Sequence, residues 1–255
     1  MIQPHLPNQN FMKKLIIASV ALCALVSSVC AEQTRKVQFR TLCLGQIEEL
    51  GTVLLWTGME LPKAQEVVLY TDVSPVIEGV FNSNEAIFYT EKPGPDGKPL
   101  RVSVGQVTLG KAQRQLLLFL PSGGGEGKLP YQVRAYDDEL STFALGSVRV
   151  INLAPVPVRF ILAGATTPQI PPVKYALFPH PAKVDAYNMY PVVIEFQSAD
   201  GKWVKGQSVS WKANERRREI VVTLVDQRFR QPTVQTFSDF PPWAGRVREL
   251  SEIQE

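Results

Sequence analysis

The stretch QLLLFLPSGGGEGKLPYQVRAY, residues 115–136, decides the fold class, because its glycine-rich centre can be interpreted in two ways. A strand followed by a glycine-rich loop is typical of a phosphate-binding loop, which has the pattern Gly, four residues, Gly-Lys and then Ser or Thr. Here Ser122 takes the place of the first glycine and Leu129 that of the hydroxyl residue. Pro130 opposes the helix whose N-terminus would hold a phosphate. We therefore predict a β-hairpin in which residues 121–130 connect two strands.

Short runs rich in Val, Ile, Phe and Tyr continue on both sides of this hairpin and predict strands almost throughout. Residues 93–97 (PGPDG) and the pair Asp200-Gly201 are turn sequences, because proline presets one backbone dihedral and glycine supplies a positive φ. The chain has 20 prolines, which argue against long helices. Only the tail, residues 244–255, has helical spacing. The fold class predicted is all-β.

The two halves of the chain match each other in the same order, so we expect one domain to be duplicated. The matched segments are 37–42 with 148–153, 53–58 with 159–164, 86–90 with 192–196, 115–120 with 219–224, and 131–138 with 232–239. Each half would have about seven short strands and no helix between them, which favours a sandwich. We predict two tandem antiparallel, immunoglobulin-like β-sandwich domains at 32–145 and 146–243, followed by a charged tail at 244–255.

Alternation along the strands indicates which side chains face the cores. Val37, Phe39 and Cys43 share one parity and are assigned to the first core, while Val209 and Trp211 share a face in the second half. Cys43 is the one cysteine outside the N-terminal segment, so no disulfide can form within the mature chain. We expect it to be a buried free thiol, with the small residue Ala154 as its counterpart in the repeat.

Residues 1–31 are predicted to be an N-terminal extension and a cleaved signal peptide. Lys13 and Lys14 precede an apolar run over 15–26, and residues 29–31 (VCA) resemble an Ala-x-Ala cleavage site. A transmembrane anchor would need about 20 apolar residues, and this run is shorter. Lipidation of Cys30 is a minor alternative, because residues 27–29 (SSV) fit a lipidation site poorly. The mature chain would have no transmembrane segment and would be periplasmic, attached to the outer envelope or secreted. Cleavage removes two lysines and no acidic residue, so the net charge falls from +3 to +1.

Several chemistries lack the residues that they need. The mature chain has one histidine, His180, which lies between two prolines and is expected to be solvated; one histidine and one cysteine make neither a catalytic triad nor a typical zinc site. The acidic run 137–139 is expected to end the first domain with turn-forming groups, because adjacent carboxylates in a strand point to opposite faces. The run 216–218 (RRR) is expected at a solvated hairpin tip, since the near-neutral charge argues against a nucleic-acid partner. We expect no catalytic residue, metal site or cofactor.

Aromatic residues are the remaining candidates for a binding site. Trp203 and Trp211 are expected to fill the second core, and Trp243 to cover its end. Tyr187 and Tyr190 lie between proline-rich segments, so we expect them to form an exposed aromatic cluster that could bind a ligand.

The chain also resembles a known family. The resemblance covers most of the mature chain and is clearest in residues 146–164 (GSVRVINLAPVPVRFILAG), 192–203 (VVIEFQSADGKW), 216–224 (RRREIVVTL) and 236–242 (TFSDFPP). These segments are similar to a family of uncharacterised secreted proteins from planctomycete- and verrucomicrobium-type bacteria. The resemblance implies an exported all-β protein, and it brings no activity and no site residues with it.

These observations favour a non-catalytic exported cell-envelope protein that binds an envelope protein or glycan through loops or sheet edges, or that has a structural role. Long loops rich in Gly and Pro at 91–99, 121–130 and 164–190 could vary on rigid scaffolds. The alternatives are a carbohydrate-binding module that uses exposed aromatic residues and a carboxylate-based hydrolase, which would need two carboxyl groups roughly 5 to 10 Å apart.

The export prediction has a direct test. N-terminal sequencing of the exported product is expected to begin near Glu32, because signal peptidase cleaves after the small residue at position 31. A mature product that keeps residues 15–26 and stays in the membrane would contradict the prediction.

Overall fold

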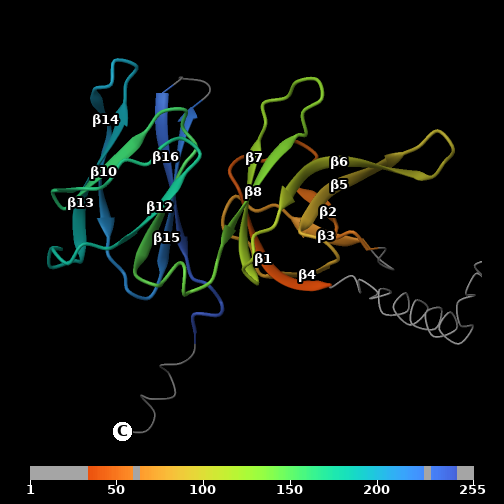
Figure 1. Cartoon of the computed structure of the whole chain (residues 1–255), viewed down its shortest axis with the longest axis horizontal. Coiled ribbons are helices and arrows are strands. Elements are labelled where there is room, and N and C mark those ends of the chain that lie inside the picture. The colour runs from red at the N-terminus through yellow and green to blue at the C-terminus, as the bar shows by residue number, and fades with distance from the viewer. Residues whose placement is uncertain (1–33, 60–63, 227–230, 246–255) are drawn as a thin grey trace, which may run out of the picture. The chain divides into compact units, whose positions relative to one another are not determined.

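The computed structural model describes residues 34–59, 64–226 and 231–245. In this part of the chain it has sixteen strands and no helix, and the strands form four sheets of four (Figure 1). The all-β prediction and the tandem sandwiches are therefore confirmed. The predicted signal peptide, 1–31, and residues 246–255 of the predicted tail lie outside the described residues.

The first sandwich consists of two sheets with the orders β4-β1-β7-β8 and β3-β2-β5-β6. Its strands are β1 (Arg35–Cys43), β2 (Thr52–Trp56), β3 (Gln65–Val68), β4 (Ile77–Phe81), β5 (Glu85–Pro93), β6 (Pro99–Thr108), β7 (Arg114–Pro121) and β8 (Tyr131–Asp137).

The second sandwich has the orders β12-β9-β15-β16 and β11-β10-β13-β14. Its strands are β9 (Ser147–Asn152), β10 (Val158–Leu162), β11 (Ala165–Thr166), β12 (Tyr175–Pro179), β13 (Met189–Gln197), β14 (Trp203–Lys212), β15 (Arg218–Asp226) and β16 (Gln231–Asp239).

The two sandwiches have the same topology strand for strand, since adding eight to each label of the first gives the second. The strand pairs are antiparallel, as predicted, except for one parallel pair in each sandwich, β1 with β7 and β9 with β15. Between the two strands of each parallel pair, the chain forms the strands of the other sheet. It therefore re-enters the first sheet in the same direction, which a tight hairpin could not achieve.

The registers correct two of the expected matches. Gln115 and Glu219 are matched positions of the two halves, and they pair with Phe39 and Val148. Phe39 therefore corresponds to Val148, two residues away from the match expected from the sequence. The counterpart of Cys43 is therefore Asn152 rather than Ala154.

The second strands correspond one residue away from the expected match. Leu55 pairs with Phe88 next to a β-bulge, and Phe160 pairs with Ile194 next to the equivalent bulge. Apolar runs of one composition can be aligned by eye in several registers, whereas the bulges fix the alignment.

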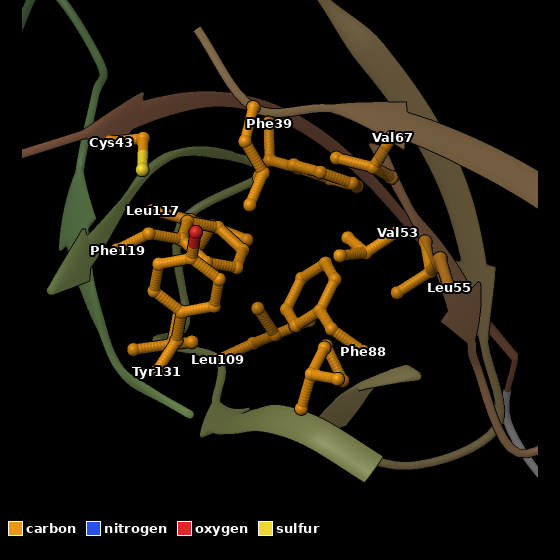
Figure 2. Close-up of a cluster of buried hydrophobic side chains, with 14 of the residues drawn as sticks. Phe39, Cys43, Val53, Leu55, Val67, Phe88, Leu109, Leu117, Phe119 and Tyr131 are labelled. Carbon is orange, nitrogen blue, oxygen red and sulfur yellow. The ribbon is translucent and has the colours of Figure 1, made fainter. Parts of the chain in front are cut away.

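Each sandwich has its own core between its two sheets. Figure 2 shows the first core, in which the aromatic rings of Phe88, Phe119 and Tyr131 meet edge to face. Val37, Phe39 and Cys43 all belong to this core, as their parity predicts. Cys43 is a free thiol with 1% of its surface exposed, and burial raises its pKa. The prediction of a buried free thiol is confirmed.

The second core contains Val209 and Trp211 as partly buried members, and the intervening Ser208 and Ser210 are exposed, so the predicted alternation of β14 is confirmed. The predicted turns are also present. Ser198 N donates to Lys202 O around Asp200-Gly201, and Gly201 has a φ of 80°.

The glycine-rich segment 121–130 is a hairpin loop between β7 and β8, as predicted. Its ends are joined by the bond from Ser122 N to Pro130 O at 2.8 Å. Gly123 to Gly125 and Gly127 have positive φ values, a conformation that residues with a Cβ rarely adopt, so the loop needs this composition for its backbone alone.

A third apolar cluster joins the two sandwiches into a stack of four sheets. Its buried members are Leu42, Leu116, Leu118, Phe143, Ile151, Ile220 and Val222. The outer faces of β1 and β7 supply the members from the first sandwich and those of β9 and β15 the members from the second, apart from Phe143 in the connection. β1, β7, β9 and β15 are therefore buried on both faces, which explains why the runs over 115–120 and 219–224 do not alternate.

Equivalent positions meet in this interface. The structural correspondence relates Leu42 to Ile151, Leu116 to Ile220 and Leu118 to Val222. The two repeats thus present the same face to each other, as the subunits of an isologous dimer do.

Truncation of one interface leucine tests the importance of this cluster. Leu118→Ala is expected to lower the free energy of unfolding by about 2–5 kcal/mol, because it leaves a cavity among fully buried side chains. The control Val80→Ala lies on an edge strand at 42% exposure and should change stability by less than about 0.5 kcal/mol. Urea denaturation measures both, and equal effects would contradict the interface.

Candidate functional site

Four charged side chains are buried between the two sandwiches. Arg40 lies in β1, Asp138 follows β8, Arg218 begins β15 and Asp239 ends β16. Each exposes at most 2% of its surface. We refer to these four residues as the buried ion cluster.

Each carboxylate of the ion cluster accepts hydrogen bonds from both guanidinium groups. Arg40 donates from Nε and Nη2 to Asp138 Oδ2 at 2.8 and 2.7 Å, and from Nη1 to Asp239 Oδ1 at 2.6 Å. Arg218 donates from Nη2 to Asp138 Oδ1 at 2.7 Å and from Nε to Asp239 Oδ2 at 2.9 Å. Two of these pairs cross from one sandwich to the other, so the cluster ties the two repeats together.

The charges in the ion cluster oppose the effect of burial to different extents. For Asp138 burial has the larger effect and raises the pKa, although Arg40 and Arg218 act against it. Burial alone would raise the pKa of Asp239, but the hydrogen bonds and charges of Arg40 and Arg218 hold it below its usual range. Burial opposes the charge of Arg40, yet the two carboxylates raise the pKa of its guanidinium above the ordinary value. Because these groups are paired with one another and closed to solvent, the arrangement joins the sandwiches and offers no group to a substrate.

The ion cluster overturns two expectations from the sequence. Arg218 was expected at a solvated tip, but only Arg216 of the run is exposed, while the partly buried Arg217 pairs with Glu219 at 2.6 Å. Asp138 was expected in a polar turn and is instead fully buried. The repeat contained a signal for the burial of Asp138. Asp138 is matched by Asp239 in the second half, whereas the residue before it is an aspartate in one half and a serine in the other.

A third buried arginine, Arg149, lies next to the ion cluster. The ring of Phe143 lies between two guanidinium groups, with Arg149 Cζ at 4.1 Å and Arg218 Cζ at 4.2 Å from its centroid. Arg149 is the structural counterpart of Arg40, but among the described residues it has no comparable carboxylate pairing, and its Nε and Nη1 have no hydrogen-bond partner there. Burial lowers the pKa of Arg149 to about 10. The aromatic face thus compensates in part for an unpaired buried charge.

The predicted exposed pair of Tyr187 and Tyr190 is not formed. Tyr187 exposes 78% of its surface, but Tyr190 exposes 1% and lies in the second core. The hydroxyl of Tyr190 lies 2.8 Å from Nδ1 of His180, and burial raises the pKa of this tyrosine. Tyr190 follows the inward-facing parity of β13, and that parity, rather than the neighbouring prolines, decides where its ring points.

His180 is also less exposed than predicted. It is half-buried beside Tyr190, and burial lowers the pKa of its imidazole. The neutral ring is therefore favoured, and it makes a structural contact with the core tyrosine rather than facing solvent.

The loop that contains Tyr187 is held in one conformation. Asp185 Oδ1 accepts hydrogen bonds from Tyr187 N and Met189 N, both at 2.8 Å. Asn188, at a φ of 61°, accepts a bond at its carbonyl from Ala213 N at 2.8 Å, which joins the loop to the end of β14. Tyr187 is thus presented to solvent from an ordered turn.

An open pocket of about 350 Å³ lies beside this loop. Its lining residues come from the end of β10, the segment before β13, and the paired parts of β13 and β14; they are Ala163, Lys183, Val184, Asp185, Met189, Tyr190, Pro191 and Ser210. The volume is at the small end of the roughly 300–1,000 Å³ typical of ligand pockets. This pocket and Tyr187 form the candidate binding site.

The three tryptophans assigned to the second core or to its end lie in different environments. Trp211 packs with Phe160 and Tyr190 against the second core, as predicted. Trp203 lies on the outer face of its sheet under Arg159, whose Cζ is 4.3 Å from the ring, so its assignment to the core was wrong.

Trp243 does not cover the second core either. Its ring stacks against two arginines of the first sandwich, Arg40 at 4.7 Å and Arg114 at 5.1 Å. The ring lies beside a member of the ion cluster, so the last described residues of the chain return to the first sandwich.

Comparison with known proteins identifies no relative, since no protein-family model and no curated protein matches the chain. The resemblance to secreted bacterial proteins therefore stays a prediction. In the part of the chain that the structure describes, no group of three or more His, Cys, Asp and Glu residues could hold a metal ion. In the same residues, no helix has the length and apolar character needed to cross a membrane.

Two arginines of one run provide a matched test of the ion cluster. Arg218→Met should lower the free energy of unfolding by about 3–5 kcal/mol, because it leaves two buried carboxylates with one guanidinium. Arg216→Met, two residues away and exposed, should change it by less than about 0.5 kcal/mol. Denaturation in urea at neutral pH compares the two, and similar losses would show that burial of Arg218 is unimportant.

Proposed function

We propose that the protein is a non-catalytic exported protein of the cell envelope, which binds another envelope macromolecule through the loop and pocket of its second sandwich. The observation that carries this proposal is the turn at 185–189. It is fixed by its own hydrogen bonds and by a strand end, yet it presents Tyr187 at 78% exposure. A large, rigid aromatic residue on an ordered loop is the arrangement that binding surfaces use, because little entropy is lost when it makes contact.

The scaffold supports this proposal. The ion cluster and the interface leucines join the two sandwiches, so the second sandwich can hold a loop in place against a large ligand. Loops on such scaffolds vary without disturbing the cores and are frequent binding sites.

The hydrolase alternative loses its most suggestive pair of carboxylates. A glycosidase needs two carboxyl groups facing a cleft that admits substrate. Asp138 and Asp239 come together through Arg40 and Arg218, but they are buried and fully paired. These two carboxylates are therefore not available for hydrolysis.

Export belongs to the same proposal and rests on residues 1–31 of the sequence. An oxidising compartment is compatible with a single buried thiol, because Cys43 has no cysteine partner among the described residues and is closed to solvent.

Sedimentation with envelope fragments tests the proposal. The full mature chain, beginning at Glu32, should bind fragments from the organism that makes it, and the bound fraction should saturate. Tyr187→Ser should weaken this binding at least about tenfold, because it removes an exposed aromatic contact. The control Tyr70→Ser removes a tyrosine of 45% exposure from the first sandwich and should have no effect.

Two treatments of the fragments separate the classes of partner. Protease treatment should abolish binding to a protein, and periodate treatment should abolish binding to a glycan. The absence of saturable binding to any envelope fraction would overturn the proposed function.

A further inference from the structure

The pocket beside Tyr187 combines chemical features that no part of the fold requires. Its walls are apolar where Val184, Met189 and Pro191 line it, and Ser210, directly opposite Pro191 in the β13–β14 pair, supplies a hydroxyl group. Lys183 and Asp185 add one charge of each sign. A ligand that fits must therefore offer an apolar face, a hydrogen-bond donor and an anionic or acceptor group.

The two charged groups are available to a ligand. Lys183 is exposed and has no ion-pair partner among the described residues. Asp185 uses Oδ1 to fix the turn, and its second oxygen, Oδ2, makes no hydrogen bond within the same residues. The carboxylate thus holds the loop with one oxygen and can accept a bond from a ligand with the other.

The presence of one ammonium group and one carboxylate in the same pocket excludes the simpler ligand classes. A purely apolar ligand would strand both charges in a dry contact, which costs free energy. A phosphate or other compact anion would bind Lys183 but would face the carboxylate of Asp185. A polycation would meet the opposite conflict.

A sugar acid meets all three requirements. Its ring carbons form an apolar face, its hydroxyl groups donate to a carboxylate, and its own carboxylate pairs with an ammonium group. The open pocket of about 350 Å³ takes a ligand of one ring while the rest of a polymer continues outside. Tyr187 does not line the pocket, but it lies between the lining residues Asp185 and Met189 in the chain, and its exposed ring can stack on a neighbouring sugar ring.

We infer that this pocket binds one residue of an acidic polysaccharide. The carboxylate of the sugar lies against Lys183, and its hydroxyl groups lie against Asp185 and Ser210. The inference rests on the proposed function and names the class of macromolecule that the second sandwich binds.

Calorimetric titration of the full mature chain tests this inference with three defined probes: an oligogalacturonate, a neutral cello-oligosaccharide and an oligoglutamate of the same charge as the first. Saturable binding is expected for the oligogalacturonate alone. It should weaken as salt is added, because an exposed ammonium group contributes to it.

Two variants locate the binding in the pocket. Lys183→Gln should weaken oligogalacturonate binding at least about tenfold, since it removes the cation without disturbing a buried contact. Asp185→Asn should weaken it as well, because the amide keeps the acceptor that fixes the turn while replacing Oδ2 with a donor. Lys174→Gln, an exposed lysine elsewhere in the second sandwich, is the control and should leave binding unchanged.

Three results would overturn the inference: no binding of the oligogalacturonate, equal binding of the oligoglutamate, or equal binding by Lys183→Gln and the unaltered chain. Any of these results, together with saturable binding to envelope fragments, would leave the proposed function standing and reject only the acidic polysaccharide. Failure of both experiments would reject the proposed function.

Discussion

Two guanidinium groups and two carboxylates, removed from water together, constrain the whole described structure. Desolvating an ion costs several kcal/mol, and only well-placed partners offset that cost. Arg40 and Asp138 pair with each other, and their remaining donor and acceptor groups are satisfied only when Arg218 and Asp239 of the other sandwich are in register with them. The ion cluster therefore stabilises the correct pairing of the sandwiches and strongly penalises any arrangement that separates one partner.

The apolar interface supplies the attraction between the two sandwiches, and the ion cluster determines the register in which they pack. Leu42, Leu116 and Leu118 lie in one cluster with their structural counterparts, so a face that would be a large exposed patch on a single sandwich is covered by the equivalent face of the second. The requirement that β7 and β15 be apolar on both faces follows from this stack. The same requirement produced the continuous run at 115–120 that resembles the strand before a phosphate loop.

The sequence predicts well what depends on neighbours along the chain. Strand composition, turn chemistry and the order of repeated segments suffice for the two sandwiches, the hairpin at 121–130 and the buried thiol of Cys43. It predicts poorly what depends on distant partners. Arg218 is one charged residue among three until Asp138, 80 positions away, is known to face it. The ring of Tyr190 turns inward because of the parity of β13, which its proline neighbours concealed.

Charged groups in this fold divide between two uses, and the division bears on function. Those of the ion cluster are paired, dry and surrounded by core residues, so a ligand could reach them only if the sandwiches separated. Those at the pocket are wet, and Lys183 and Asp185 each retain a group that the described residues do not use. Because a solvated charge costs little in the folded protein, the pocket can change its ligand by single substitutions. A change at the ion cluster would instead endanger the fold, so recognition is expected to vary at the loop while the interface stays fixed.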